Sequence, residues 1–142
     1  MIHAAKLPQR PTPSDSSVLP ALPSALPRLA NPYDDTEPLD ARVQAYLHSN
    51  CASCHVPAGG GNSAMELSHP TEWPKMGILD ATPKHHDLGI AGAKLVWSGN
   101  PQKSLLLQRM ARRGKDQMPP ISSNLVDHRA VALLKRWIEG LP

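Results

Sequence analysis

Both cysteines of this 142-residue chain lie in one short stretch, Asn-Cys-Ala-Ser-Cys-His, at positions 50–55. Cys51 and Cys54 are three residues apart, and His55 follows directly. Whatever fold the chain adopts must therefore hold two sulfur atoms and an imidazole close together. A disulfide, a redox dithiol, half of a zinc site and the anchor of a larger group all use such a stretch.

Three of these interpretations fit the rest of the chain poorly. A structural zinc site needs four ligands, and the chain has no further cysteine and no His-x-x-x-His pair. A thioredoxin-like dithiol requires a preceding strand and a βαβ frame, which the sequence does not predict. A structural disulfide explains the cysteines but leaves His55 without a role.

The fourth interpretation uses all three residues. In a Cys-x-x-Cys-His stretch both thiols add across the vinyl groups of a haem, and the histidine reaches the iron. The chain has no Phe and only 4% aromatic residues, so its core needs bulk that a bound cofactor would supply. We therefore expect one covalent haem c, attached at Cys51 and Cys54, with His55 as an axial ligand.

Met118 is the candidate for the second axial position. It stands in Asp-Gln-Met-Pro-Pro, where two prolines stiffen the backbone around a ligand that has no covalent tether. Met110 more naturally packs inside a leucine-rich helix. The other candidates lie in the long middle region: Met65, Met76, His69, His85 and His86. His/Met ligation raises the reduction potential and leaves no vacancy on the iron, which favours electron transfer over catalysis.

Helical patterns surround the cysteine stretch. Residues 38–50 carry an apolar stripe that leads into Cys51, namely Leu39, Val43, Tyr46 and Leu47. A second helix is expected over 101–113, with Asn100 as N-cap, Pro101 at its first position and Gly114 at its end. A third is expected over 125–139, capped by Asn124 and ended by Gly140. Residues 56–90 read as a long loop, and 93–97 as a short extended piece.

The remaining composition limits the function classes. Residues 1–36 hold seven of the sixteen prolines and predict a linker or arm, which leaves 37–142 as one domain. No apolar run is long enough to span a membrane, and no signal-peptide core is visible. The net charge of +3 is mild, and the one basic cluster lacks the interleaved aromatics of a nucleic-acid site. Its members Arg109, Arg112 and Arg113 could instead pair with haem propionates or form a solvated helix end.

The order helix, Cys-x-x-Cys-His, long loops, Gln-Met-Pro-Pro and amphipathic helix resembles a class I cytochrome c domain. The resemblance covers about residues 38–141 and rests on Cys51, Cys54, His55 and Met118. It implies an all-α fold whose N- and C-terminal helices cross beside the haem, with Tyr46 and Leu47 meeting Leu134 and Trp137. A narrower likeness is to monohaem domains at the C-termini of larger bacterial proteins, some fused to dehydrogenase-like or repeat domains.

The resemblance implies an electron carrier rather than an enzyme, passing single electrons from a dehydrogenase-type donor, fused or separate, to a downstream acceptor. A haem-based sensor or a peroxidase-like enzyme with a dissociable distal ligand is the alternative. Because haem c is attached outside the cytoplasm in bacteria, a periplasmic location follows from the cofactor. The oligomeric state and the carbonyl that orients His55 stay open.

Overall fold

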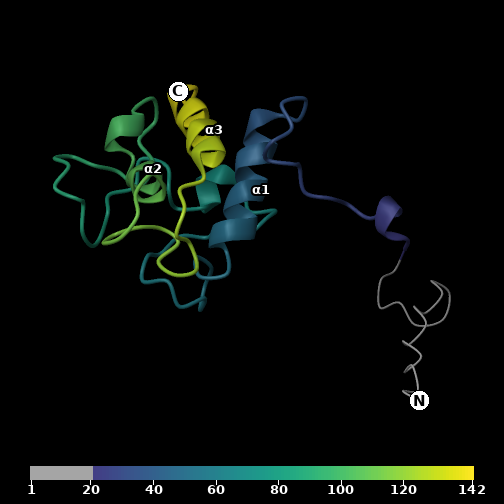
Figure 1. Ribbon diagram of the computed structural model, residues 1–142, viewed down its shortest axis with the longest axis horizontal. Helices are drawn as coiled ribbons and strands as arrows, with labels where there is room; N and C mark the ends of the chain where they lie inside the picture. The colour runs from purple at the N-terminus through teal and green to yellow at the C-terminus, as the bar shows by residue number, and fades with distance from the viewer. Residues whose placement is uncertain (1–20) are drawn as a thin grey trace, which may run out of the picture.

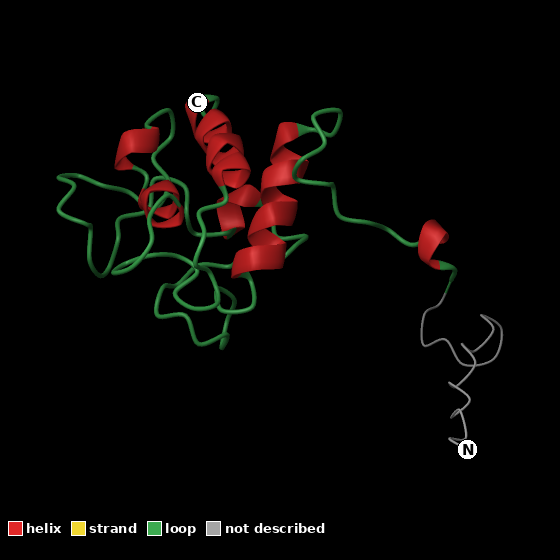
Figure 2. Cartoon of the chain, in the orientation of Figure 1, coloured by secondary structure: helices red, strands yellow, loops and turns green. Residues whose placement is uncertain are grey.

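Three α-helices form the regular framework of residues 21–142, the part of the chain that the computed structural model describes (Figures 1 and 2). They are α1 (Leu39–Cys51), α2 (Leu105–Met110) and α3 (His128–Glu139). Short 3-10 turns lie at Pro23–Ala25, Trp73–Lys75 and Pro101–Lys103. Within this part of the chain no strand forms, and the β contacts are the isolated parallel bridges Leu79–Val96 and Lys94–Ser104. The predicted all-α class is confirmed.

The first and last helices form the centre of the molecule and lie next to each other in Figure 1. Residues spaced three and four apart on α3 are buried, as one apolar stripe requires; they are Ala130, Leu133, Leu134, Trp137 and Ile138. The facing side of α1 buries Val43, Tyr46 and Leu47. All eight side chains belong to one core cluster, so Tyr46 and Leu47 share a core with Leu134 and Trp137 as expected.

The long loop after α1 contributes its own part of the core. Apart from the turn at Trp73–Lys75 it has no helix, which agrees with the predicted loop over 56–90. Leu67, Met76 and Ile78 are nevertheless at most 1% exposed. The loop therefore wraps the helix pair and is held by apolar burial rather than by regular hydrogen bonding.

The prediction of a single helix over 101–113 is wrong at both its start and its end, because α2 covers only Leu105–Met110. Asn100 caps the start as expected, since its side chain accepts the Lys103 amide, but only a 3-10 turn follows. Ser104 is extended, and its buried hydroxyl donates to the Asn100 carbonyl. A serine hydroxyl that bonds to a nearby backbone carbonyl stabilises a non-helical conformation of its own backbone. Helix α2 therefore begins at the residue after Ser104, Leu105.

The other end of α2 lies at Met110, three residues before the expected end. Arg112 Nε donates to the Gln108 carbonyl and Arg113 Nη1 donates to the Met110 carbonyl. The Met118 amide donates to the Arg109 carbonyl. In a continuing helix these three carbonyls would accept the amides four residues on. Side chains and a distant amide replace those bonds, so Gly114 does not cap a helix.

The start of the last helix is also corrected. It begins at His128 rather than 125, and Asp127 caps it through a hydrogen bond from the Ala130 amide at 2.9 Å, a role predicted for Asn124. The Leu125 carbonyl instead accepts a bond from Arg113, and the Leu125 side chain is 85% exposed. The helix therefore starts where a carboxylate satisfies its first amides.

The segment that precedes α1 is fastened to the helix pair. Buried Arg42 donates to the Pro32 carbonyl at 2.9 Å and pairs with Asp35 at 2.7 Å. The Tyr33 hydroxyl donates to Asp127, and the Arg129 guanidinium lies 4.3 Å from the Tyr33 ring centre. Residues 1–20 of the expected linker lie outside the described part of the chain, so the predicted boundary at residue 37 stays a prediction.

No helix in residues 21–142 has the length and apolar character needed to cross a membrane.

Candidate functional site

The Cys-x-x-Cys-His stretch forms the end of α1 and the turn after it. Cys51 is the last residue of the helix, and its carbonyl accepts the amides of both Cys54 (3.1 Å) and His55 (2.9 Å). This turn brings Cys51, Cys54 and His55 together within one tight bend of five residues. Both thiols are free, Cys51 half-buried and Cys54 exposed.

The protonation of Cys51 bears on the dithiol alternative. Burial, with the neighbouring Cys54 as the smaller cause, raises the pKa of the Cys51 thiol to about 12. Redox dithiols depend on a thiolate whose pKa is lowered. Cys51 is therefore a neutral thiol near pH 7 and is poorly suited to start thiol–disulfide exchange.

The His55 ring has an unusual environment. Its Nδ1 atom is buried and has no hydrogen-bond partner within residues 21–142. Burial lowers the pKa of His55 below its ordinary value of 6.5, so the imidazole is neutral near pH 7. A neutral imidazole is the form that binds a metal ion. A buried ring nitrogen without a partner is costly, and such an atom in a native structure calls for a further group.

Glycines pack closely behind this histidine. The Gly61 amide donates to the Cys54 carbonyl at 2.9 Å. A Cβ atom at position 61 would lie 2.7 Å from that carbonyl oxygen and 3.0 Å from Nδ1 of His55. At Gly59 a Cβ would also lie 2.7 Å from the Cys54 carbonyl oxygen. The sequence predicted only a loop here, because close approach of backbone to a side chain has no local signature beyond the glycines themselves.

Met118 lies in the loop between α2 and α3, half-buried, with its amide bonded to the Arg109 carbonyl at 3.0 Å. The preceding residue, Gln117, ties the loop together. Its side chain accepts the Gly114 amide at 2.7 Å and donates to the carbonyls of Pro119 (2.9 Å) and Ser123 (3.0 Å). The rigidity expected from the prolines is thus supplied in part by a glutamine clamp that the sequence did not reveal.

The two halves of the predicted site are connected through residues 85 and 86. His85 Nε2 lies 2.8 Å from the carbonyl oxygen of Asn62, next to Gly61. The His86 carbonyl accepts a bond from Arg109 at 2.8 Å, and Arg109 in turn holds the Met118 amide. The loop behind His55 and the loop of Met118 are therefore parts of one hydrogen-bonded structure.

The other candidate ligands are engaged elsewhere. Met110 and Met76 are buried in the core, which confirms the packing role predicted for Met110, and Met65 packs against that core. The His85 ring is bonded to Asn62, and His86 Nδ1 accepts the Leu88 amide at 3.2 Å. His69 is exposed. Among the candidate methionines, Met118 is the one that neither belongs to the core cluster of residues 21–142 nor packs against it.

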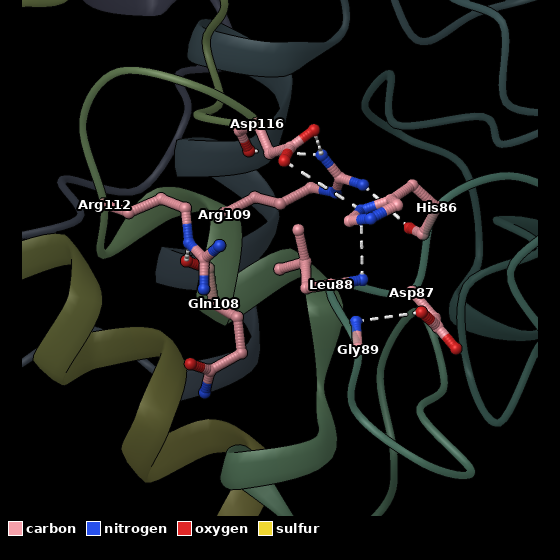
Figure 3. A network of polar contacts seen from close by, with 8 residues as sticks. All are labelled: His86, Asp87, Leu88, Gly89, Gln108, Arg109, Arg112 and Asp116. Atoms are coloured by element: carbon pink, nitrogen blue, oxygen red, sulfur yellow. Dashed lines mark hydrogen bonds and ion pairs between the residues drawn. The ribbon is translucent and has the colours of Figure 1, made fainter.

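The three arginines proposed for propionates all donate to backbone carbonyls, and Figure 3 shows this for Arg109 and Arg112. Arg109 reaches Asp116 and His86, Arg112 reaches Gln108, and Arg113 reaches Met110, Arg112 and Leu125. Pairing with a propionate stays a prediction for them, and it would have to compete with these bonds.

No family model, curated protein or solved structure matches this chain. The chemistry of the site must therefore be judged from its own residues. Within residues 21–142 no three His, Cys, Asp or Glu side chains are grouped so that they could hold a metal ion by themselves. Two free thiols and a half-buried neutral imidazole on one turn do fit a haem held by thioether bonds.

Proposed function

We propose that this chain is the electron-transfer module of a c-type cytochrome, with one haem attached at Cys51 and Cys54 and ligated by His55 and Met118. The observation that carries the proposal is the turn at the end of α1. It places two free thiols beside a half-buried histidine whose imidazole is neutral near pH 7. A haem bound there supplies an iron that changes charge by one electron.

The residues of the chain have separate tasks in this proposal. Cys51 and Cys54 anchor the ring from one helical turn, so that it cannot dissociate. His55 stays neutral through burial, and Gly59 and Gly61 leave room behind it. Met118 supplies a soft thioether that favours the reduced state and fills the other axial position. The core side chains of α1 and α3 keep water away from one side of the site.

The finer assignments rest on the resemblance to class I cytochrome c domains. They are the crossing of α1 over α3, a dehydrogenase-like donor (fused or separate), a downstream acceptor and a periplasmic location. The mildly basic surface, with a net charge of +3, favours acidic partners.

The decisive experiment is to produce the chain in bacteria with the haem-attachment machinery active. We expect a red protein whose haem stays on the chain in a denaturing gel, and loss of that band in the Cys51→Ala/Cys54→Ala variant. Oxidised protein should show the near-infrared band of a thioether-ligated iron, and Met118→Ala should remove it. A colourless protein would contradict the proposal.

The same preparation separates the carrier from the alternative of a sensor or peroxidase-like enzyme. An electron carrier keeps its thioether band when low concentrations of cyanide or carbon monoxide are added. Rapid ligand binding with turnover of peroxide would favour the enzyme instead.

A further inference from the structure

Arg109 makes more connections around the Met118 loop than any other side chain in Figure 3. It lies in the last turn of α2, and its side chain is only 17% exposed. Its backbone carbonyl accepts the Met118 amide at 3.0 Å. One residue of a helix thus bonds directly to the backbone of the predicted ligand.

The guanidinium of the same residue holds the chain two positions before Met118. Nη1 donates to the Asp116 carbonyl at 3.1 Å and lies 3.8 Å from Oδ1 of the Asp116 carboxylate. Asp116 has a φ of +65°, a left-handed conformation that a non-glycine residue adopts at a cost. The surrounding contacts must therefore maintain this turn. Arg109 contacts Asp116 itself, alongside His86, whose Nδ1 lies 3.9 Å from the Asp116 carboxylate.

The second terminal nitrogen reaches across to another loop. Nη2 donates to the His86 carbonyl at 2.8 Å, and the neighbouring His85 ring is bonded to Asn62. The planar fork of an arginine presents two separate nitrogens to the Asp116 and His86 carbonyls, whereas a lysine has a single nitrogen for both. Figure 3 shows the two nitrogens turned toward these partners.

We propose that Arg109 is the positioning residue for Met118, and that it sets how firmly the thioether occupies its axial place. This inference rests on the proposed function. It gives Arg109 a role different from the propionate contact suggested by the sequence, because both ends of its fork are directed at backbone carbonyls. Arg136, an exposed arginine in the last turn of α3, has no side-chain hydrogen bond or ion pair among residues 21–142 and provides a control of the same residue type.

The test compares the holoprotein with Arg109→Gln, Arg109→Lys and Arg136→Gln, using imidazole as a competing ligand. Imidazole binds only when Met118 leaves, so its apparent Kd reports how firmly the thioether is held. Loss of a hydrogen bond from a charged group should lower that Kd by roughly tenfold or more in Arg109→Gln. Arg109→Lys should give a smaller decrease in Kd, and Arg136→Gln should match the wild type within about twofold.

Urea unfolding midpoints of the same proteins separate positioning from general stability. If Arg109→Gln lowers the midpoint but leaves the imidazole Kd unchanged, Arg109 is merely structural and the proposal is overturned. Should Arg109→Gln fail to accumulate, Arg109→Lys carries the test, and a wild-type Kd in that variant also overturns it.

The two proposals fail in different ways. A wild-type protein without covalent haem, or without a band that depends on Met118, would end the proposed function together with this inference. A wild-type protein with that band, whose Arg109 variants bind imidazole with the same Kd as Arg136→Gln, would end only the inference.

Discussion

The indole Nε1 of Trp137 donates a hydrogen bond to the Asp40 carboxylate over 2.7 Å and joins the last turn of α3 to the first turn of α1. Trp137 is 2% exposed, and its ring lies 4.5 Å from that of Trp73, between ring centres. One side chain therefore links both central helices to the loop that wraps them. The helix pair is fixed at this end by a charged hydrogen bond.

Replacing Trp137 with Phe should lower the free energy of unfolding by about 2 kcal/mol, because the Asp40 carboxylate loses a buried donor. The urea midpoint, followed by circular dichroism, measures the change. Trp97→Phe is the matched control, since Trp97 is half-buried and lies outside the α1–α3 contact. Equal midpoints for both variants would show that the Trp137–Asp40 bond contributes nothing.

Asp127 should make the stability depend on pH. Burial raises the pKa of its carboxyl, but bonds from the Tyr33 hydroxyl and the Ala130 and Arg129 amides outweigh burial, and the net pKa lies below the ordinary 3.8. A lowered pKa in the folded state adds stability above about pH 4, which is lost as the pH falls through the folded pKa.

The Asp127→Asn variant tests this dependence, because asparagine can still cap α3 but carries no charge. We expect the variant to be less stable than the wild type at pH 7, and the difference to shrink as the pH falls below 3.8. Urea midpoints measured from pH 7 down to acid follow it. A difference that is the same at every pH would mean that the charge of Asp127 has no part in it.

Gly61 should be needed for the placement of His55. In Gly61→Ala the new Cβ would approach the Cys54 carbonyl and His55 Nδ1 too closely, so the turn must shift. We expect a clearly lower yield of covalently attached haem, measured by haem staining against total protein. Gly60→Ala is the control: its φ of +87° imposes backbone strain of about 1–2 kcal/mol, but nothing lies within 4 Å of the added methyl. Similar yields for the two variants would contradict the role of Gly61.

The segment before α1 should add to the stability of the domain. A chain that begins at residue 31 keeps the contacts of Pro32 with Arg42 and of Tyr33 with Asp127 and Arg129, whereas one that begins at 37 loses them. We expect the longer chain to melt at least about 4 °C higher, as a difference of about 1 kcal/mol would produce. Matching melting temperatures would instead support the predicted boundary at residue 37.

Local patterns were enough for much of the framework. The apolar stripes of residues 38–50 and 125–139 predicted α1 and α3, because the residues that share one face of a helix recur every three or four positions along the sequence. The Cys-x-x-Cys-His stretch predicted which side chains would come together at the end of α1, because five consecutive residues on a helical turn can hardly lie apart. The loop over 56–90 followed from its prolines and glycines.

The features that the sequence predicted wrongly or did not predict all depend on contacts between residues far apart in the chain. Helix α2 ends at Met110 because the Met118 amide and two arginine side chains donate hydrogen bonds to its last carbonyls. Helix α3 begins at His128, after Asp127, whose carboxylate also accepts a hydrogen bond from the Tyr33 hydroxyl. Three further features depend on such distant contacts: the close packing of Gly61 behind His55, the hydrogen bonds of the Gln117 side chain, and those of the Arg109 guanidinium. A hydrogen bond across many residues forms only once the core has brought its partners together, so no window of the sequence contains it.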